Sequence, residues 1–369
     1  MNGLIIRTTG SAYHVLLDDG STVEAYVKGN FRIRGIRSTN PVAVGDRVTV
    51  QQQADGTRWI TAIEDRRNYI IRRSTNLSKQ SHILACNIDQ AALLVTINHP
   101  RTATTFIDRF LATCEAYRVP AILIFNKIDL YSEEDLEELQ YMQLLYGNLG
   151  YPTYAISAKS LETAQTPNNA SFQLSTFDFR LIFSGKTTLL SGNSGVGKST
   201  LLNALFGEEK AKTGEISAVH DQGKHTTTFS EMYFLSPFPV SKADILSPEG
   251  ARTTSEGAND LPKEDNASLA LLGERVPAGR ERGWSRFAGA VIDTPGIRGF
   301  GTFDFEKEEV GHYFREIFAK SADCRFSNCL HQGEPGCAVL PAVESGEIAY
   351  SRFESYQSLL GDCEENKYR

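Results

Sequence analysis

The fold of this chain follows from one stretch of its sequence, Gly192-Asn193-Ser194-Gly195-Val196-Gly197-Lys198-Ser199. The stretch is preceded by a strand-like apolar run, Thr187 to Ser191, and followed by a helical run that starts at Thr200. In this setting the glycines let backbone N–H groups surround a phosphate at a helix N-terminus. Lys198 would neutralise the terminal phosphates, and the Ser199 hydroxyl would bind magnesium. The stretch therefore predicts a phosphate-binding loop, with a chance glycine-rich turn as the alternative.

Two short motifs upstream are typical of a guanine-binding site. Asn126-Lys127-Ile128-Asp129 follows the apolar run Ala121 to Phe125, so Asp129 would lie at the carboxyl edge of a sheet, where ligands bind. Its carboxylate can accept hydrogen bonds from the guanine N1–H and exocyclic amine, a donor pair that adenine lacks. Ser157-Ala158-Lys159, after the strand Thr153 to Ile156, supplies a loop whose backbone can contact the guanine carbonyl. Together with the phosphate loop, these motifs favour GTP over ATP.

Two later motifs are suited to sensing the γ-phosphate. Asp293-Thr294-Pro295-Gly296 follows the apolar strand Gly289 to Ile292, which suits a carboxylate on the magnesium side and a Gly296 N–H on the γ-phosphate. Lys224-His225-Thr226-Thr227-Thr228 offers a threonine hydroxyl to magnesium and the γ-phosphate, which would order that stretch while GTP is intact. The spacing does not decide which threonine acts. Thr227 is the first candidate and Thr228 the second.

The order of these motifs is informative. The base-reading pair at residues 126 to 159 precedes the phosphate loop at residue 192, whereas in ordinary GTPases the phosphate loop comes first. The chain ends of compact domains often lie close together, so the same site can be assembled from a rotated order. The GTPase domain would then end just after Gly296. We therefore hypothesise that the carboxyl-terminal module is tethered to a γ-phosphate-responsive element and moves with nucleotide state.

The first 75 residues differ from the rest in pattern and charge. Turn signals such as Asp19-Gly20 and Asp55-Gly56 separate short alternating runs, which predict the strands Gly3 to Thr8, Tyr13 to Leu17, Thr22 to Lys28, Arg47 to Gln52 and Arg58 to Ile63. Such strands fit a small OB-type barrel, with a small sheet that merely packs on its neighbour as the alternative. Eleven Lys and Arg against seven Asp and Glu give this segment a net charge of +4, whereas the whole chain carries −7. With Arg32, Arg34 and Arg37 in one loop, we expect the barrel to contact RNA.

The remainder of the chain alternates apolar runs with helical stretches. Helical stretches at Phe106 to Tyr117 and Ser132 to Tyr146 follow the apolar runs Gln90 to Ile97 and Ala121 to Phe125, which predicts an α/β fold with a parallel sheet covered on both faces. Residues 236–286, rich in Ser, Pro, Gly and mixed charge, are interpreted as a mobile insertion. No run of the sequence approaches the roughly 18 apolar residues of a membrane span. The first ten residues lack the pattern of a secretory signal, so we expect a cytoplasmic protein.

A cluster of soft ligands lies near the carboxyl end. Three thiols and one imidazole fall within fourteen residues, and they are Cys324, Cys329, His331 and Cys337. Such a set closes a tetrahedral structural zinc site with no position left for water, and the metal would supply folding energy to a small segment. Reduced cysteines in a loop are the alternative. The other three cysteines, Cys86, Cys114 and Cys363, are interpreted as packing or surface thiols.

Further motifs bring out a resemblance to a known family. They are Gly45-Asp46-Arg47-Val48, Ala85-Cys86-Asn87-Ile88-Asp89-Gln90, Asp108-Arg109, Cys324-Arg325-Phe326 and Glu334-Pro335-Gly336-Cys337. With the nucleotide motifs, they make the chain resemble, over nearly its whole length, the RsgA family of circularly permuted ribosome-biogenesis GTPases. The resemblance implies an OB-type barrel over residues 1–75, a circularly permuted GTPase domain over 76–305 and an α-helical zinc-binding domain over 306–369. It also implies action late in maturation of the small (30S) ribosomal subunit, which stimulates hydrolysis. Residues 236–286 depart from the family by being longer than its usual short hairpin there.

The catalytic group is the least defined part of the site. Ras-type GTPases place a water-orienting glutamine directly after the switch glycine, but this chain has Ile297, whose aliphatic side chain cannot hold a water. Intrinsic hydrolysis is therefore expected to be slow. The resemblance places His225 in the nucleotide-responsive loop, and imidazole can position or activate water near neutral pH. A loop histidine without a catalytic part is the alternative. Lys198 and Thr227 complete the predicted catalytic set.

The sequence favours a cytoplasmic GTPase that binds immature small subunits and their rRNA through the barrel and the zinc module, with GTP and Mg²⁺ in the site and one structural Zn²⁺. Neither DNA nor membrane is an expected partner, and a monomer is expected. A nucleotide-gated RNA-binding scaffold with negligible hydrolysis is the competing class. A metabolic P-loop kinase is disfavoured, because it would have no use for guanine-reading motifs and tandem binding modules.

Overall fold

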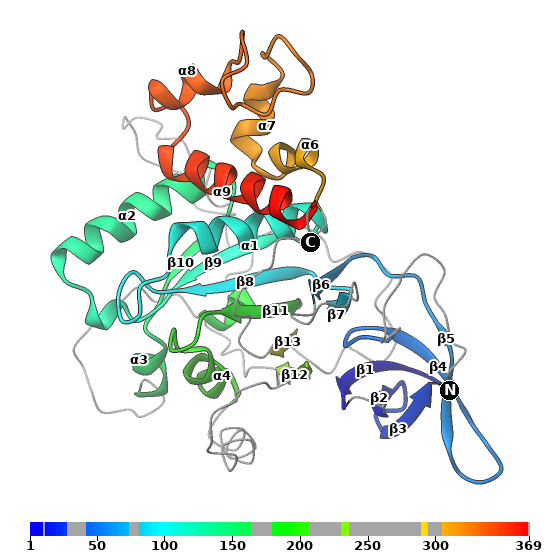
Figure 1. Ribbon diagram of the computed structural model, residues 1–369. Helices are drawn as coiled ribbons and strands as arrows, with labels where there is room; N and C mark the ends of the chain where they lie inside the picture. The colour runs from blue at the N-terminus through cyan, green and yellow to red at the C-terminus, as the bar shows by residue number, and fades with distance from the viewer. Residues whose placement is uncertain are drawn as a thin grey trace, which may run out of the picture.

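The computed structural model describes residues 1–9, 12–27, 42–73, 81–163, 179–206, 230–235, 289–293 and 305–367. Figure 1 shows a small barrel at one side, a central sheet flanked by helices, and a carboxyl-terminal helical module lying against helix α1. The predicted RNA-contacting arginines Arg32, Arg34 and Arg37 and the predicted insertion at 236–286 lie outside the described residues.

The amino-terminal segment forms the expected barrel. Its strands are β1 (Asn2–Thr8), β2 (Ala12–Leu17), β3 (Thr22–Val27), β4 (Arg47–Gln52) and β5 (Arg58–Ile63). They follow the order β1-β2-β3-β5-β4, and β4 returns to pair with β1, so the sheet closes on itself. Alternate apolar residues such as Ile5, Val15 and Val48 fill the interior, because successive side chains of a strand point to opposite faces. The predicted OB-type barrel is therefore confirmed, and its contact with RNA stays a prediction.

The central domain is the expected parallel sheet with helices on both faces. Its strands are β8 (Gln90–Val95), β9 (Ala121–Phe125), β10 (Thr153–Ala155), β11 (Thr187–Gly192), β12 (Glu231–Leu235) and β13 (Gly289–Asp293), in the order β10-β9-β8-β11-β13-β12. All pairings are parallel except that of β12 with β13. The main helices are α1 (Thr104–Ala116), α2 (Glu133–Asn148), α3 (Ala158–Thr163) and α4 (Lys198–Phe206).

The alternation of buried residues along β8 separates two cores. Ala91 and Leu93 belong to the cluster with α1 and α2, whereas Ala92 and Leu94 belong to the cluster with α4. A strand buried on both faces reads as a continuous apolar run, which is why the sequence of β8 shows no polar face. The phosphate loop follows β11, the neighbour of β8, and therefore lies at the carboxyl edge in the middle of the sheet.

The barrel and the central sheet are joined edge to edge. β12 pairs antiparallel with β1 through the register Arg7↔Glu231, so barrel and central strands form one eleven-stranded sheet among the described residues. A hairpin of β6 (Tyr69–Arg73) and β7 (Ser81–Cys86) lies between the two domains in sequence. The sequence patterns predicted neither this hairpin nor β12.

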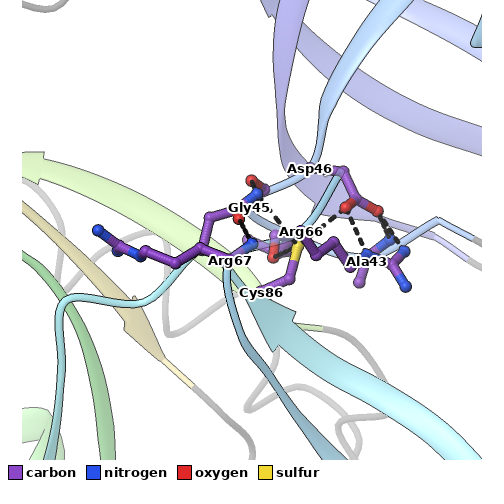
Figure 2. Close-up of polar contacts among 8 residues, drawn as sticks. Ala43, Gly45, Asp46, Arg66, Arg67 and Cys86 are labelled. Carbon is purple, nitrogen blue, oxygen red and sulfur yellow. Dashed lines mark hydrogen bonds and ion pairs between the residues drawn. The ribbon is translucent and has the colours of Figure 1, made fainter. Parts of the chain in front are cut away.

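A buried cluster of Asp46, Arg66 and Cys86, here called the Asp46 cluster, holds the barrel to β7 (Figure 2). Arg66 donates from Nε and Nη2 to the two Asp46 carboxylate oxygens at 2.7 Å each, and the Cys86 thiol lies 3.0 Å from Asp46 Oδ1. Gly45 has φ +97°, and a Cβ there would lie 2.1 Å from the Cys86 carbonyl oxygen. The Gly-Asp and Ala-Cys-Asn motifs that carried the family resemblance therefore build a domain junction.

The carboxyl-terminal module packs on the GTPase core through α1. Its helices are α6 (Lys307–Val310), the 3₁₀ turn η5 (Gly311–Tyr313), α7 (Arg315–Ser321), α8 (Val339–Glu344) and α9 (Tyr350–Lys367). Arg352 of α9 donates to Asp108 of α1 at 2.7 Å and to Glu316 of α7 at 2.7 Å. Both Asp108 and Arg352 are buried. Among the described residues, no helix is long and apolar enough to cross a membrane.

Candidate nucleotide site and metal centre

The phosphate loop connects β11, which ends at Gly192, with α4, which begins at Lys198. Gly197 has φ +99°, and a Cβ there would lie 2.4 Å from the Asn126 amide nitrogen. Only glycine fits this position, because the asparagine that follows β9, two strands away from β11 in the sheet, approaches the loop backbone there. Gly197 thus allows the phosphate loop and the base-reading motif to contact each other.

Lys198 and Asp293 lie close enough at the phosphate end of the site to interact electrostatically, and Lys198 Nζ donates to the Gly192 and Asn193 carbonyls. Burial lowers the pKa of the Lys198 ammonium, and the charge of Asp293 opposes that shift. Burial also raises the pKa of the Asp293 carboxyl to about 6, although Lys198 opposes the rise. Asp293 Oδ1 is buried and accepts no hydrogen bond from any described residue. A buried carboxylate oxygen without a donor suits a hydrated cation such as Mg²⁺, and Ser199, exposed in the first turn of α4, supplies a second oxygen.

The base-reading motif is tied to the phosphate loop by its own side chains. Asn126 donates from Nδ2 to the Val196 carbonyl at 2.8 Å and accepts at Oδ1 from the Ala158 N–H at 2.9 Å. Lys127 has φ +68° and donates from Nζ to the Gly195 carbonyl at 2.6 Å. These contacts bring three sequence motifs into one site. Asn126 and Val196, which are joined by one of these hydrogen bonds, are 70 residues apart in the sequence.

Asp129 is held by the second base-reading motif. The Ser157 hydroxyl donates to Asp129 Oδ1 at 2.5 Å, which leaves Oδ2 without that donor. The surrounding cavity of ≈ 310 Å³ is lined by Asn126, Lys127, Asp129, Leu130, Ala158, Lys159, Gly197 and Thr200. A carboxylate fixed at the wall of such a cavity can select a ligand that presents two adjacent N–H donors. Of the predicted nucleotide residues, His225, Thr227, Thr228 and Gly296 lie outside the described residues.

One loop of the site was not predicted. It follows β8 and includes His99, whose carbonyl accepts a hydrogen bond from Lys127 Nζ at 2.5 Å. The ring of Pro100 lies 3.5 Å from the position that a Cβ on Gly195 would take. Lys127 therefore bridges this loop and the phosphate loop. The sequence held a signal for this loop, because the loop follows a predicted strand of a parallel sheet. The carboxyl ends of parallel strands, such as β8 and its neighbour β11, share one edge of the sheet.

The four predicted metal ligands lie together in the carboxyl-terminal module. The ligand atoms of Cys324, Cys329, His331 and Cys337 all lie within 4.8 Å of one another. His331 Nδ1 is 3.7 Å from Cys324 Sγ and 3.4 Å from Cys337 Sγ, so Nδ1 is the nitrogen that faces the centre. Three thiols and an imidazole in this arrangement fit a tetrahedral divalent metal with soft-ligand preference.

The loop around these ligands is fixed by a neighbouring carboxylate and by α9. Glu334 accepts from the Leu330 N–H at 2.8 Å and the Gln332 N–H at 2.7 Å, on either side of His331. The Tyr356 hydroxyl of α9 donates to the Leu330 carbonyl at 2.9 Å. Burial, with a contribution from Cys337, raises the pKa of the Cys329 thiol to about 12, so a cation is needed to favour its thiolate. The other cysteines, Cys86, Cys114 and Cys363, are buried away from this cluster, and Cys86 belongs to the Asp46 cluster.

Comparison with known proteins gives a consistent result. Residues 63–237 match the RsgA GTPase family, and residues 2–60 match the RsgA N-terminal domain. The chain is 50% identical to the small ribosomal subunit biogenesis GTPase RsgA of Bacteroides fragilis, covering 100% of this chain and 99% of that protein. It is 47% identical to the protein of that name from Porphyromonas gingivalis, with the same coverage.

Solved structures match over the full length as well. The structure of YjeQ from Thermotoga maritima has 26% identity and a TM-score of 0.63, covering 98% of each chain. YloQ, described as a circularly permuted GTPase, has 28% identity and a TM-score of 0.61, covering 100% of this chain and 96% of its own. The rotated order of motifs is therefore shared with a solved structure of the same architecture.

Proposed function

This chain belongs to the RsgA family of GTPases, and on that premise we propose that it is a late assembly factor of the small ribosomal subunit. It binds GTP, associates with the immature subunit and its rRNA, and hydrolyses GTP to GDP and phosphate when the subunit stimulates it, which times its release. The observation that carries the nucleotide part of this proposal is the network joining Asn126, Lys127 and Asp129 to the phosphate loop and to Ser157 and Ala158. Similarity to small ribosomal subunit biogenesis GTPases supports the assembly role.

Each part of the nucleotide has a proposed set of contacts. Asp129 reads the guanine edge, and Ser157, Ala158 and Lys159 close that side of the base. The phosphates are bound by the loop from Gly192 to Thr200, namely Gly192, Asn193, Ser194, Gly195, Val196, Gly197, Lys198, Ser199 and Thr200. Ser199 and Thr227 bind Mg²⁺, with Asp293 on its side, and Thr228 and Gly296 contact the γ-phosphate. These assignments are supported by motif order and by the burial of Asp293 Oδ1 without a donor.

Hydrolysis is proposed to depend on three residues and on the partner. Lys198 stabilises the charge that develops on the transferred phosphoryl group, Thr227 holds Mg²⁺, and His225 positions the attacking water. Because Ile297 cannot orient water, the subunit must complete the site. Magnesium would supply charge neutralisation between the phosphates.

Three modules are proposed to divide the work. Residues 1–75 form a barrel that binds rRNA, residues 76–305 form the GTPase domain, and residues 306–369 form a zinc-binding domain. The soft ligand set of Cys324, Cys329, His331 and Cys337 favours Zn²⁺ over harder cations. The basic charge of the first 75 residues supports contact with phosphate backbones.

The guanine-reading proposal is tested by Asp129→Asn. The substitution removes the acceptor charge opposite two donors, so GDP affinity measured by calorimetry should fall by about ten- to a hundredfold. Glu133→Gln, an exposed change in the adjacent helix, should alter affinity by less than about twofold. Retention of the full guanosine preference over adenosine in the Asp129 variant would contradict the proposal.

The enzymatic proposal is tested by measuring GTP turnover while titrating purified small subunits. Turnover should rise with subunit concentration, and His225→Ala should lower the stimulated rate. Turnover that is unaffected by subunits would exclude the assembly-factor role. Unchanged stimulated turnover in the His225 variant would remove that residue from the mechanism and leave the role intact.

A further inference from the structure

A row of charged side chains extends from the barrel strand β1 across β12 to β13 at the phosphate site. In the antiparallel pairing of β1 with β12, Arg7 lies directly opposite Glu231. In the antiparallel pairing of β12 with β13, Glu231 lies directly opposite Asp293. Directly opposed residues of antiparallel strands point to the same face. Arg7, Glu231 and Asp293 therefore form a line of +, − and − charges across three hydrogen-bonded strands.

The phosphate end of this row is the site described above. Asp293 is the first residue of the Asp-Thr-Pro-Gly motif, and its carboxylate interacts with Lys198. Glu231 places a second negative charge next to Asp293. Arg7 Nε lies 4.0 Å from Glu231 Oε2 and partly neutralises that charge. The barrel thus contributes a cation to the electrostatic surroundings of the phosphate site.

The strand β12 is also fixed against the phosphate-loop helix. The Tyr233 hydroxyl donates to Glu231 Oε2 at 3.1 Å, and the Tyr233 ring packs on Phe206 of α4 with centroids 5.6 Å apart. On the other side, the β1–β2 pairing shifts register between Ile5 and Arg7. Such an irregularity bends a strand and redirects its end. Here it lies between the part of β1 that pairs with β4, Asn2 to Leu4, and Arg7, which pairs with β12 while β2 stays paired on the other edge.

We infer that Arg7 and Glu231 are positioning residues that couple binding of the ribosomal subunit by the barrel to the nucleotide state of the phosphate site. This inference rests on the proposed function and adds the route between its two halves. A displacement of β1 on binding moves β12 directly, because the strands share one sheet. The Arg7 and Glu231 side chains are 49% and 39% exposed, so a phosphate group of RNA can compete for Arg7.

The test is the ratio of subunit affinities with GDP and with a non-hydrolysable GTP analogue, measured by co-sedimentation with purified small subunits. This ratio reports coupling and is insensitive to a uniform loss of binding. Arg7→Ala and Glu231→Gln should each bring the ratio about two- to fivefold closer to one, as expected for loss of one partly exposed ion pair. In the double variant the affinity ratio should move toward one by no more than in either single variant, because the residues act as a pair. Arg7→Lys should keep the wild-type ratio.

Arg47→Ala is the matched control. Arg47 is a barrel arginine paired with Asp18 at 3.0 Å, away from β12. Its loss should weaken binding equally with both nucleotides and leave the ratio unchanged. A wild-type ratio in Arg7→Ala, or additive losses in the double variant, would overturn the inference while leaving the proposed function in place. Absence of any subunit binding or stimulation in the wild-type protein would instead overturn the proposed function itself.

Discussion

The two accessory modules contact the GTPase core in physically different ways. The carboxyl-terminal module is attached by a buried ion pair, in which the side chains of Asp108 and Arg352 are 0% and 1% exposed, and by the more exposed pairs Arg109–Asp362 and Arg315–Glu115. The barrel has one buried attachment, the Asp46 cluster, and one half-exposed attachment, the pairing of β1 with β12. A buried pair cannot separate without leaving an unpaired charge, whereas a half-exposed pair can exchange partners with solvent or RNA.

The difference bears on which module responds to nucleotide. From the sequence we hypothesised that the carboxyl-terminal module moves, because the chain leads into it from the Asp-Thr-Pro-Gly motif. That connection, residues 294–304, lies outside the described residues, and the described contacts of the module are with α1 and, through Arg315, with Leu149 and Tyr151 just after α2. The barrel, in contrast, is hydrogen-bonded to the strand beside β13. Contact geometry therefore links the barrel to the phosphate site, and movement of the carboxyl-terminal module stays a prediction.

The largest effect is expected from removing the metal. Cys337→Ser or a chelator should unfold the carboxyl-terminal module, because structural zinc supplies about 10–16 kcal/mol of folding free energy in small zinc domains. Zinc content by atomic emission and hydrogen exchange over residues 306–367 would measure this. Exchange in the barrel strands should stay unchanged. Full protection of the module in metal-free protein would show that its apolar core suffices.

The next effect concerns the junction of α1 with α9. Arg352→Met leaves Asp108 and Glu316 without their partner, and should lower the free energy of unfolding by about 3–5 kcal/mol. Urea denaturation followed by circular dichroism would measure it. Arg109→Gln is the control, because Arg109 pairs with Asp362 in the same junction but is partly exposed. This control substitution should lower the free energy of unfolding by less than about 1 kcal/mol. Equal losses in the two variants would refute the distinction drawn from burial.

Disrupting the Asp46 cluster should lower the free energy of unfolding by an intermediate amount. Asp46→Asn removes the charge that two Arg66 nitrogens contact, and should cost about 2–3 kcal/mol, as for hydrogen bonds to a charged group. Arg66 is more exposed than Arg352, at 7% against 1%, so it can recover some hydration. The same denaturation experiment applies. A loss as large as that of Arg352→Met would mean that the barrel is held as rigidly as the metal-binding module.

The smallest effect on stability is expected at the half-exposed pair. Arg7→Ala should change the free energy of unfolding by less than about 1 kcal/mol. Its effect on nucleotide-dependent subunit binding should be detectable nevertheless. Differential scanning calorimetry would show whether the transition of the barrel is retained. A large destabilisation would indicate that Arg7 is a structural residue and that changed coupling in this variant reflects unfolding.

Continuous motifs could be recognised from the sequence because their chemistry is local, although the roles of their residues stay predictions. Lys198 and Ser199 follow the glycines of their own loop, and the four metal ligands fall within fourteen residues. The barrel strands and the central strands β8, β9, β11 and β13 were predicted close to their observed bounds, because apolar alternation and apolar runs report burial directly. The short strand β12 was missed. Its five residues follow polar sequence and carry no alternation strong enough to identify a strand.

The amino-acid sequence by itself determined the guanine-nucleotide class, the order of the motifs and the cluster of three cysteines and a histidine that could hold a metal, since each depends on residue types at short spacing. Only the tertiary structure decided how the modules attach. Asp108 and Arg352 are 244 residues apart, and Arg7 and Glu231 lie on strands of different domains. Nothing in the local sequence distinguishes such charges from ordinary surface residues. Their roles arise when folding excludes water from one pair and aligns the other in a shared sheet.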